Sequence, residues 1–285
     1  MEITAQALGF TPVSDGWRRT IAGRELRFAR VRARDDFEQC ERLQREVFGV
    51  SEHDLASFSI LVMVPKTGGE VLGAFDGDRM VGYIQGYGGY VNGQPRLISD
   101  LMAVEPAYRG GLGYALKILQ AAVTLEAGFP EIRWTVDPLR AANARLNFER
   151  LGAFSNEYIE NLYGEDFAEG LYGGMPSDRL VVTWPLMSER VRQRLLSGYQ
   201  PLAPDTLDAV PDYSAHAPDS ARLMIPSDID ATLVRDPDDA RAWRMRVRAT
   251  LQAAFSAGYA ITGFAGQSSS AVGYLHLEHD REVTR

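Results

Sequence analysis

The stretch that most constrains the fold of this chain runs from Arg96 to Gly128. It opens with an apolar run that ends before Pro106, which predicts a β-strand. It closes with apolar residues at three- and four-residue spacing, which predicts an amphipathic helix. Gly128 caps this helix and Pro130 prevents its continuation. A tight, glycine-rich turn separates the two elements, so strand, turn and helix N-terminus follow one another directly.

The glycine-rich turn has the character of an anion-binding loop. Gly110, Gly111 and Gly113 carry no Cβ, so the backbone can fold tightly and present several N–H groups to one point. The first turn of the helix adds unpaired N–H donors and the positive end of the helix dipole. Arg109 supplies a charge beside them. The turn is therefore interpreted either as a phosphate or pyrophosphate site or as a device for packing helix on strand.

Two common phosphate-binding loops do not fit this turn. A Walker A loop requires Lys and then Ser or Thr after its last glycine, but Tyr114 and Ala115 follow Gly113. A dinucleotide-binding fingerprint requires Gly or Ala three residues further on, where Leu116 stands. A nucleotide-dependent enzyme is therefore the least favoured reading of the chain.

The segment AVEPAYRGGLGYALK resembles motif A of the GNAT acetyltransferases. In that motif an apolar strand and a "VxPxYRG" sequence lead to Gly-x-Gly at the start of a helix. The family usually has Arg or Gln, two residues, Gly, one residue and Gly. Here the distance from Arg109 to Gly113 is one residue short, so either Arg109 or the first family glycine is displaced.

This resemblance implies that the chain binds acetyl-CoA as co-substrate and needs no metal. The pyrophosphate would lie at the backbone of the turn, and the acyl carbonyl beside the strand that precedes it. Backbone N–H groups near Val104 would polarise the thioester oxygen. The residues implied in this part of the chain are Leu101, Met102, Ala103, Val104, Arg109, Gly110, Gly111, Leu112, Gly113, Tyr114 and Ala115.

A second segment, LRAANARLNFERLGAF, resembles the GNAT pattern "N-x-x-A-x-x-x-Y-E-K-x-G-F". The likeness makes Asn143 a candidate for hydrogen-bonding the pantetheine arm of CoA; the alternative is an ordinary helix-surface asparagine. Many GNAT enzymes use a Tyr in this helix to protonate the leaving thiolate. Phe148 stands in that register, and a phenyl ring has no proton to donate. Tyr163 is chosen as the acid, with Tyr158, a water molecule or a purely packing role for Tyr163 as alternatives.

In the GNAT pattern an amine attacks the thioester directly, and it must first lose a proton because an ammonium has no lone pair. Asp100 is the nearest ionisable residue on the central strand and the candidate for this general base. The alternative is a charged residue on a half-exposed strand face. The strand at 101–104 is expected to diverge from the one at 132–136, so that the pantetheine amides pair with strand backbone.

The phrases WTVDPL, NARLN, LGA, NLYG and SDRLVVTW are similar to a little-characterised GNAT subgroup, named by sequence likeness rather than by a known substrate. The resemblance covers residues 24–186. It implies an α+β fold, with a mixed, mostly antiparallel twisted sheet and helices on both faces. We expect a GNAT domain over 1–198, a proline-rich linker over 199–220, and a small α+β segment over 221–285 that packs on the main domain.

Local patterns predict several further elements. A strand at 24–34 leads to a helix that ends at Gly49 and buries Cys40, and Asp76-Gly77 marks a hairpin. After a strand at 131–136, Asp137 caps a helix whose first residue is Pro138. Two strands follow at 157–164 and 179–186.

Near the C-terminus, Asp236 and Pro237 start a long helix that Gly258 closes. Arg241, Arg244 and Arg248 lie largely off its apolar stripe. Such a run of arginines usually forms a solvated face, with an anion-binding role as the alternative.

Composition narrows the function classes. The chain has 285 residues and a net charge of −8, which argues against generic binding to nucleic acid. Its single cysteine fits a reducing compartment. The N-terminus lacks the pattern of a signal peptide, and the longest apolar run, at 60–64, is too short to span a bilayer. We therefore expect a cytoplasmic protein without a membrane partner, with a homodimer left open.

Three function hypotheses remain. The first is an N-acyltransferase that acetylates a small amine or amino-acid-like metabolite. The second is a non-catalytic CoA-binding or interaction module, favoured by Phe148. The third is the nucleotide-dependent enzyme. The acceptor is not encoded in a motif, because acceptor pockets are built from variable loops.

Overall fold

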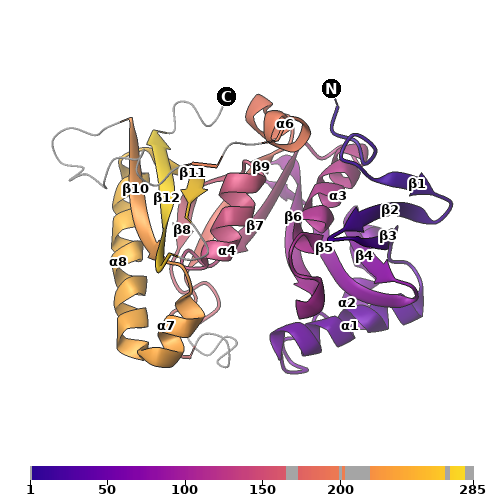
Figure 1. The fold of residues 1–285 in the computed structure, drawn as a ribbon, viewed down its shortest axis with the longest axis horizontal. Helices are drawn as coiled ribbons and strands as arrows, with labels where there is room; N and C mark the ends of the chain where they lie inside the picture. The colour runs from indigo at the N-terminus through magenta and orange to yellow at the C-terminus, as the bar shows by residue number, and fades with distance from the viewer. Residues whose placement is uncertain (1, 165–172, 199–200, 203–218, 267–269, 280–285) are drawn as a thin grey trace. The chain divides into compact units, whose positions relative to one another are not determined.

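The computed structural model describes residues 2–164, 173–198, 201–202, 219–266 and 270–279. By its internal packing the chain divides into two units (Figure 1). Unit 1 comprises residues 1–133 and 185–187, and unit 2 comprises residues 134–184 and 188–285. Unit 2 thus combines the C-terminal segment with residues that the sequence analysis assigned to the domain over 1–198.

Unit 1 is built on a sheet whose strand order is β1-β2-β3-β4-β5-β6-β7. Each neighbouring pair from β1 to β6 is antiparallel, whereas β6 and β7 are parallel. Strand β7 begins in unit 1 and ends in unit 2. The prediction of a mixed, mostly antiparallel sheet is confirmed. The strands are β1 Thr11–Val13, β2 Gly16–Ile21, β3 Arg24–Arg30, β4 Glu70–Asp76, β5 Arg79–Val91, β6 Gln94–Val104 and β7 Glu131–Val136.

Helices cover both faces of the unit 1 sheet, as predicted. On one face the core includes Cys40 of α1 and Tyr83 of β5, and Cys40 is fully buried. On the other face α3 approaches β5 so closely that a Cβ on Gly82 would lie 3.1 Å from Leu112. The helical segments are α1 Arg34–Phe48, α2 Phe58–Leu61, the 3-10 turns η1 Val64–Thr67 and η2 Pro106–Tyr108, and α3 Leu112–Glu126.

The hairpin between β4 and β5 forms where the sequence indicates, with its turn one residue later than expected. Asp76 pairs with Arg79, so the two turn residues are Gly77 and Asp78 rather than Asp76 and Gly77. Gly77 has a φ of 59°, a left-handed conformation that glycine adopts without strain. The helix α1 ends at Gly49, as predicted.

Unit 2 continues from β7 in the strand order β7-β9-β8-β11-β12-β10. Helix α8 packs along β8, β10 and β11, and Figure 1 shows it beside β10. The strands are β8 Phe154–Ile159, β9 Arg179–Pro185, β10 Ser220–Pro226, β11 Tyr259–Ala265 and β12 Val272–His279. The helices are α4 Ala141–Ala144, which continues as the π-helix η3 Arg145–Arg150, then α6 Glu189–Leu196, α7 Ile229–Arg235 and α8 Pro237–Ser256.

Several element boundaries in unit 2 differ from the sequence prediction, and the structure gives a physical reason for two of these differences. The helix after β7 begins at Ala141 rather than Pro138, because the Asp137 side chain accepts a hydrogen bond from Leu139 N–H and forms a turn instead of a cap. Strand β8 ends at Ile159 rather than at residue 164. Asn161 adopts a left-handed φ of 47°, which an extended strand does not allow.

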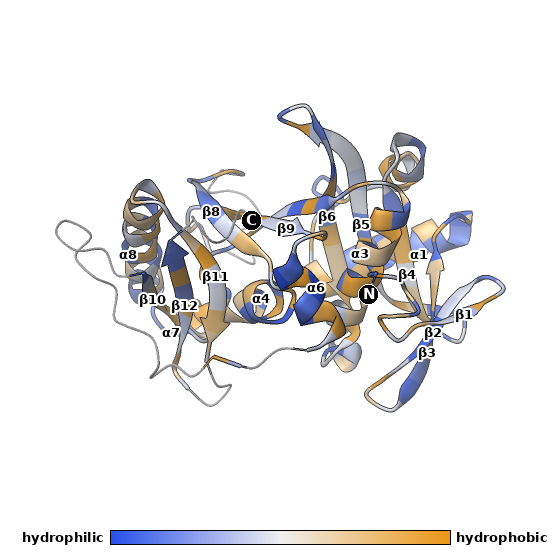
Figure 2. Ribbon diagram, turned by 90° about the horizontal axis from the view of Figure 1, so that it is seen from above, coloured by the Kyte–Doolittle hydropathy of each residue, from blue (hydrophilic) through white to orange (hydrophobic). Residues whose placement is uncertain are grey.

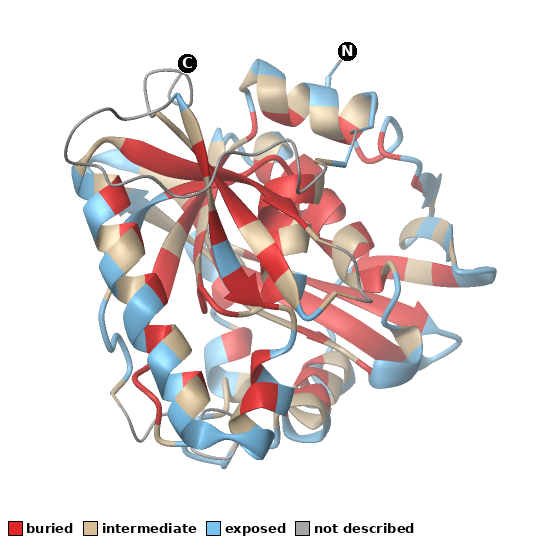
Figure 3. Ribbon diagram, turned by 60° about the vertical axis from the view of Figure 1, so that its left-hand side comes forward, coloured by how far each residue is buried: buried red, intermediate tan, exposed pale blue. Residues whose placement is uncertain are grey.

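Helix α8 has the predicted cap but not the predicted solvated arginine face. Asp236 accepts hydrogen bonds from two N–H groups of the first turn, and Pro237 is the first helical residue. Hydrophilic and hydrophobic residues share the helix in Figure 2, and Figure 3 shows that it has both buried and exposed residues. Arg244 is fully buried, so the prediction is wrong for that residue. The sequence pattern places Arg244 on the polar side of the helix and does not indicate that an acidic residue pairs with it.

Candidate active site

The turn after β6 presents backbone rather than side chains. Gly110 and Gly111 have φ angles of 106° and 139°, which only glycine adopts readily. A Cβ on Gly110 would meet nothing within 4 Å, so the turn is open on that side. Gly111 is the N-cap of α3, and among the described residues no side chain caps this helix. The first N–H groups of α3 therefore face an open glycine turn.

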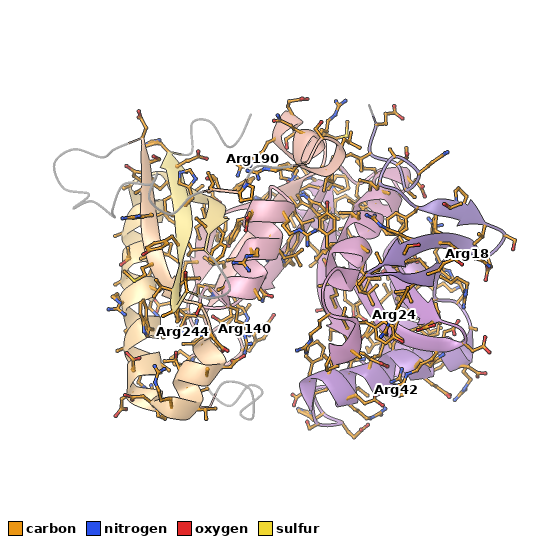
Figure 4. All side chains as sticks on the ribbon, in the orientation of Figure 1. Arg18, Arg24, Arg42, Arg140, Arg190 and Arg244 are labelled. Carbon is orange, nitrogen blue, oxygen red and sulfur yellow. The ribbon has the colours of Figure 1, made fainter. Side chains whose placement is uncertain are left out.

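The two residues before the glycines, Tyr108 and Arg109, differ in the contacts that their side chains make. Tyr108 donates a hydrogen bond to Asp76 (2.7 Å), and Arg24 lies over its ring at 4.7 Å. Figure 4 labels Arg24. Arg109 is exposed, and in the part of the chain that the structure describes it makes no ion pair. Its guanidinium therefore remains available for an anion at the turn.

Helix α3 begins at Leu112, so Gly111 and Gly113 frame its first turn. A Cβ on Gly113 would point at Met102 of β6, with 3.3 Å to the methyl carbon of that side chain. The Gly-x-Gly of the sequence thus brings the start of the helix against the end of the strand. Leu112 and Ala115 are buried, and Tyr114 is half-buried.

The edge of β6 that faces β7 is paired over a short distance. Within the described residues, the register between the two strands gives Leu97 opposite Ile132 and Ile98 opposite Arg133. The four residues predicted to line the acyl group lie beyond these pairs, and their register is with β5. Ala103 is buried among them, while Leu101, Met102 and Val104 are half-buried. Because residues 101–104 lie beyond the pairs with β7, this edge of β6 suits a ligand that adds to the sheet as a strand does.

Asp100 lies at an irregularity of β6. Leu101 pairs with Gln85 and Ser99 with Gly86, which leaves Asp100 as the extra residue of a β-bulge. Bulges often redirect a side chain near a functional site. Asp100 is exposed, and its carboxylate accepts a hydrogen bond from Gln85 Nε2 at 2.7 Å.

Further polar atoms accompany Asp100 on the same strand pair. Gln85 is fully buried, and its Oε1 has no hydrogen-bond partner among the described residues. The hydroxyl of Tyr83 is buried and has no partner there either. Burial first, and then the charge of Asp100, raises the pKa of Tyr87. The sequence analysis missed these three residues, although their spacing on β5 places them on one face of the strand.

Lys117 is a second charged group that the sequence analysis did not single out. It is 4% exposed in the middle of α3, and its Nζ donates to Ser99 Oγ at 3.0 Å. Burial lowers the pKa of Lys117 to about 7. The interior of unit 1 therefore holds an amine on the α3 face, opposite to the face that carries Asp100.

Asn143 belongs to unit 2, in the short helix α4. It is half-buried, and its backbone N–H donates to the carbonyl of Arg140 at 3.0 Å. The side-chain amide makes no hydrogen bond to another described residue. The π-helix η3 follows α4 at once, and such π-helical turns are frequent at functional sites.

The two aromatic residues relevant to proton donation have opposite surroundings. Phe148 is 1% exposed and is part of the unit 2 core. Tyr163 is 48% exposed, and its hydroxyl lies 3.3 Å from Thr135 Oγ1 of β7. Tyr158 donates a hydrogen bond to Asp178 (2.6 Å), and burial together with this bond raises the pKa of Tyr158. Of the two tyrosines, Tyr163 is the more exposed residue.

Comparison with known proteins gives likenesses of fold over part of the chain. No protein-family model matches it, and no curated protein matches it. A protein from Desulfovibrio desulfuricans described as an acetyltransferase of the GNAT family aligns with 56% of this chain and 99% of its own, at 17% identity and a TM-score of 0.47. An aminoglycoside 6′-acetyltransferase of type Ii aligns with 57% of this chain and 98% of its own, at 16% identity and a TM-score of 0.45. A chain from the structure of the NatC complex bound to Gag peptide and CoA aligns with 56% of this chain and 98% of its own, at 17% identity and a TM-score of 0.45.

A membrane-spanning helix needs a minimum length and hydropathy. Across the described ranges, every helix is too short or too polar to cross a lipid bilayer.

Proposed function

We propose that this protein is an acyl-CoA-dependent N-acyltransferase that transfers an acetyl group from acetyl-CoA to a small amine or amino-acid-like metabolite. The observation that carries the proposal is the turn from Arg109 to Gly113. Its open glycines, its exposed arginine and a helix N-terminus that no described side chain caps together suit a pyrophosphate. The short pairing of β6 with β7 supports a place for the pantetheine arm on the strand edge.

The proposed reaction is a direct attack. The amine lone pair forms a bond to the thioester carbonyl carbon, the C–S bond breaks, and the thiolate leaves. Asp100 takes the proton that the ammonium must lose, because its exposed carboxylate is held by Gln85 at the bulge. Tyr163 gives a proton to the departing thiolate, a role supported by the 48% exposure of this residue. The second proton, which the nitrogen loses as it becomes an amide, then restores the phenol. Asn143 binds the pantetheine arm through its side-chain amide.

The polar atoms on β5 support an amine as the acceptor. Among the described residues Gln85 Oε1 has no hydrogen-bond donor, the Tyr83 hydroxyl oxygen can accept as well, and Asp100 adds a carboxylate. Such a set of oxygens suits a group that brings N–H donors and positive charge. Unpaired buried acceptors cost free energy, and an ammonium donor would satisfy them.

Two measurements test the proposal: first the binding of acetyl-CoA, and then the release of free thiol from it. Calorimetric titration of the whole chain with acetyl-CoA should show saturable binding, and Arg109→Gln should weaken it about tenfold by removing one charge-assisted contact. Release of free thiol from acetyl-CoA, followed in the presence of a panel of amines, should then identify an acceptor. Absence of acetyl-CoA binding in the folded wild type would reject the proposal.

A second candidate is a non-catalytic CoA-binding module. The buried Phe148 favours it, because the position that carries a proton donor in many GNAT enzymes holds a ring without a hydroxyl. This candidate predicts acetyl-CoA binding with no thiol release for any amine. Release that depends on an amine and is lost in Asp100→Asn would exclude it.

A further inference from the structure

The turn that follows β7 is held from several sides by the C-terminal part of unit 2. Arg244 of α8 forms two hydrogen bonds with Asp137, Nη1 to Oδ1 at 2.8 Å and Nη2 to Oδ2 at 2.7 Å. Both side chains are almost fully buried, at 0% and 2% exposure. A parallel pair of this kind fixes the orientation of the carboxylate as well as its position.

Asp137 transmits this orientation to the backbone. The same Oδ1 that contacts Arg244 also accepts the N–H of Leu139 at 2.8 Å, and the Asp137 carbonyl accepts the N–H of Arg140 at 3.3 Å. Arg140 in turn accepts the N–H of Asn143 through its carbonyl. A continuous series of hydrogen bonds therefore runs from Arg244 to the residue proposed to bind pantetheine.

Two more contacts tie the same short segment to the C-terminal part. Arg140 Nη1 donates to Asp230 of α7 at 2.8 Å, and Arg145 Nη2 donates to the carbonyl of Gly266, just after β11, at 2.6 Å. Figure 4 labels Arg140 and Arg244. The segment from 137 to 145 thus has partners in α7, in α8 and next to β11, all within unit 2.

The charge state of the buried pair is well defined. Burial by itself raises the pKa of Asp137, but the charge of Arg244 and its hydrogen bonds outweigh burial and leave the pKa of Asp137 below its usual value. The carboxylate is therefore ionised at neutral pH and available as a double acceptor. Removal of the carboxylate would take away the acceptor of the Leu139 N–H and leave Arg244 buried without its counter-charge.

From these contacts we infer that Arg244 is a positioning residue for the cofactor-binding segment. Through Asp137 it holds the turn before α4 in the conformation that presents Asn143 to the pantetheine arm. The C-terminal segment then serves the proposed acyltransferase, although none of its residues is placed in contact with substrate. This inference rests on the proposed function.

The test compares two arginines on the same helix. Arg244→Met removes the guanidinium that orients Asp137. Arg248→Met, one turn further along α8, removes the ion pair with Asp178 at 2.7 Å and serves as the matched control. Folding of each variant is checked by circular dichroism, and Arg244→Lys, which keeps the charge but not the paired hydrogen bonds, replaces Arg244→Met if that variant does not fold.

Two measurements are made on the full chain. Calorimetric titration should show acetyl-CoA binding weakened about tenfold in Arg244→Met, partly restored in Arg244→Lys, and changed by less than about twofold in Arg248→Met. Hydrogen exchange should show loss of protection at the amide of Leu139 in Arg244→Met alone. Wild-type affinity, or a protected Leu139 amide, in a folded Arg244 variant would overturn the inference. A wild type that does not bind acetyl-CoA would instead overturn the proposed function.

Discussion

Two turns of this protein follow a strand of the sheet and lead into a helix, yet they are built in opposite ways. The turn after β6 consists of glycines and an exposed Arg109, and no described side chain caps its helix. The turn after β7 is organised by the Asp137 side chain, which is buried and bonded to both Leu139 and Arg244. In the first turn the backbone N–H donors face outward. In the second turn the Asp137 carboxylate is paired with other groups of the protein.

The first turn can therefore bind a ligand, whereas the second holds the local backbone in place. Backbone N–H groups left open at a helix N-terminus form a site for an anion, because a ligand can supply the missing acceptors. A buried carboxylate that is fully paired has no such capacity, and its main effect is to hold the local backbone. The comparison predicts that substitutions in the first turn change ligand binding, whereas those in the second change stability first.

The largest effect is expected for Asp137→Ala. This change leaves the guanidinium of Arg244 buried without a counter-charge, which costs ~3–5 kcal/mol of unfolding free energy. Urea denaturation followed by circular dichroism measures it. The control is Asp230→Ala, which removes the half-exposed partner of Arg140 and should cost less than about 1 kcal/mol. Equal and small losses for both variants would contradict the view that the second turn depends on a buried pair.

For the first turn, Gly113→Asp should weaken acetyl-CoA binding by about 100-fold or more without loss of stability. A carboxylate in the first turn of α3 stabilises the helix dipole but competes with the phosphate for the same N–H groups. Calorimetric titration measures the change.

Gly113→Ala is the control for this variant. Its Cβ would meet only the flexible end of Met102, at 3.3 Å, so binding should change by less than about threefold. If Gly113→Asp kept wild-type affinity for acetyl-CoA, the phosphate would have to bind elsewhere.

Tyr163→Phe removes a hydroxyl and keeps the ring, so it distinguishes a role of Tyr163 in proton transfer from a role in the packing of unit 2. If Tyr163 is the acid, turnover should fall by about 100-fold while the affinity for acetyl-CoA stays nearly constant. Steady-state kinetics with the best amine of the panel measures both quantities. Unchanged turnover would make Tyr163 a packing residue and leave water or Tyr158 as the donor.

Lys117 extends the comparison to a buried amine, whose Nζ donates a hydrogen bond to Ser99 Oγ. Burial lowers the pKa of Lys117 to about 7 in the folded protein, whereas an unfolded lysine titrates near ~10.4. Between these values the unfolded chain binds one more proton, so the unfolding free energy should rise with pH by up to ~1.4 kcal/mol per pH unit.

Lys117→Met should abolish this rise, and Lys66→Met, at an exposed lysine of η1, should preserve it. Denaturation curves at several pH values between ~7 and ~10 measure the slope. A Lys117→Met variant with the wild-type slope would assign the pH dependence to another group.

Much of the fold could be predicted from sequence where the signal is local. The end of α1 at Gly49 and the start of α8 at Pro237 follow from cap chemistry within one or two turns of chain. The glycine turn after β6 is of the same kind, since its φ angles require the residues that stand there. In contrast, no local pattern places a bulge residue at Asp100, because its position depends on how β5 and β6 align across their whole length.

What the sequence by itself determined about this protein is therefore the class of fold, which its resemblance to a known family implies, and the form of the first turn, which follows from backbone sterics. The tertiary structure alone decided the role of Arg244. Its partner Asp137 lies 107 residues away along the chain, and no local pattern relates the two. The helix face of Arg244 looks solvated in sequence, and only the packing of α8 in unit 2 makes it a buried, paired position. Burial of a guanidinium costs much less free energy where a carboxylate pairs with it, and that pairing is a property of the folded chain.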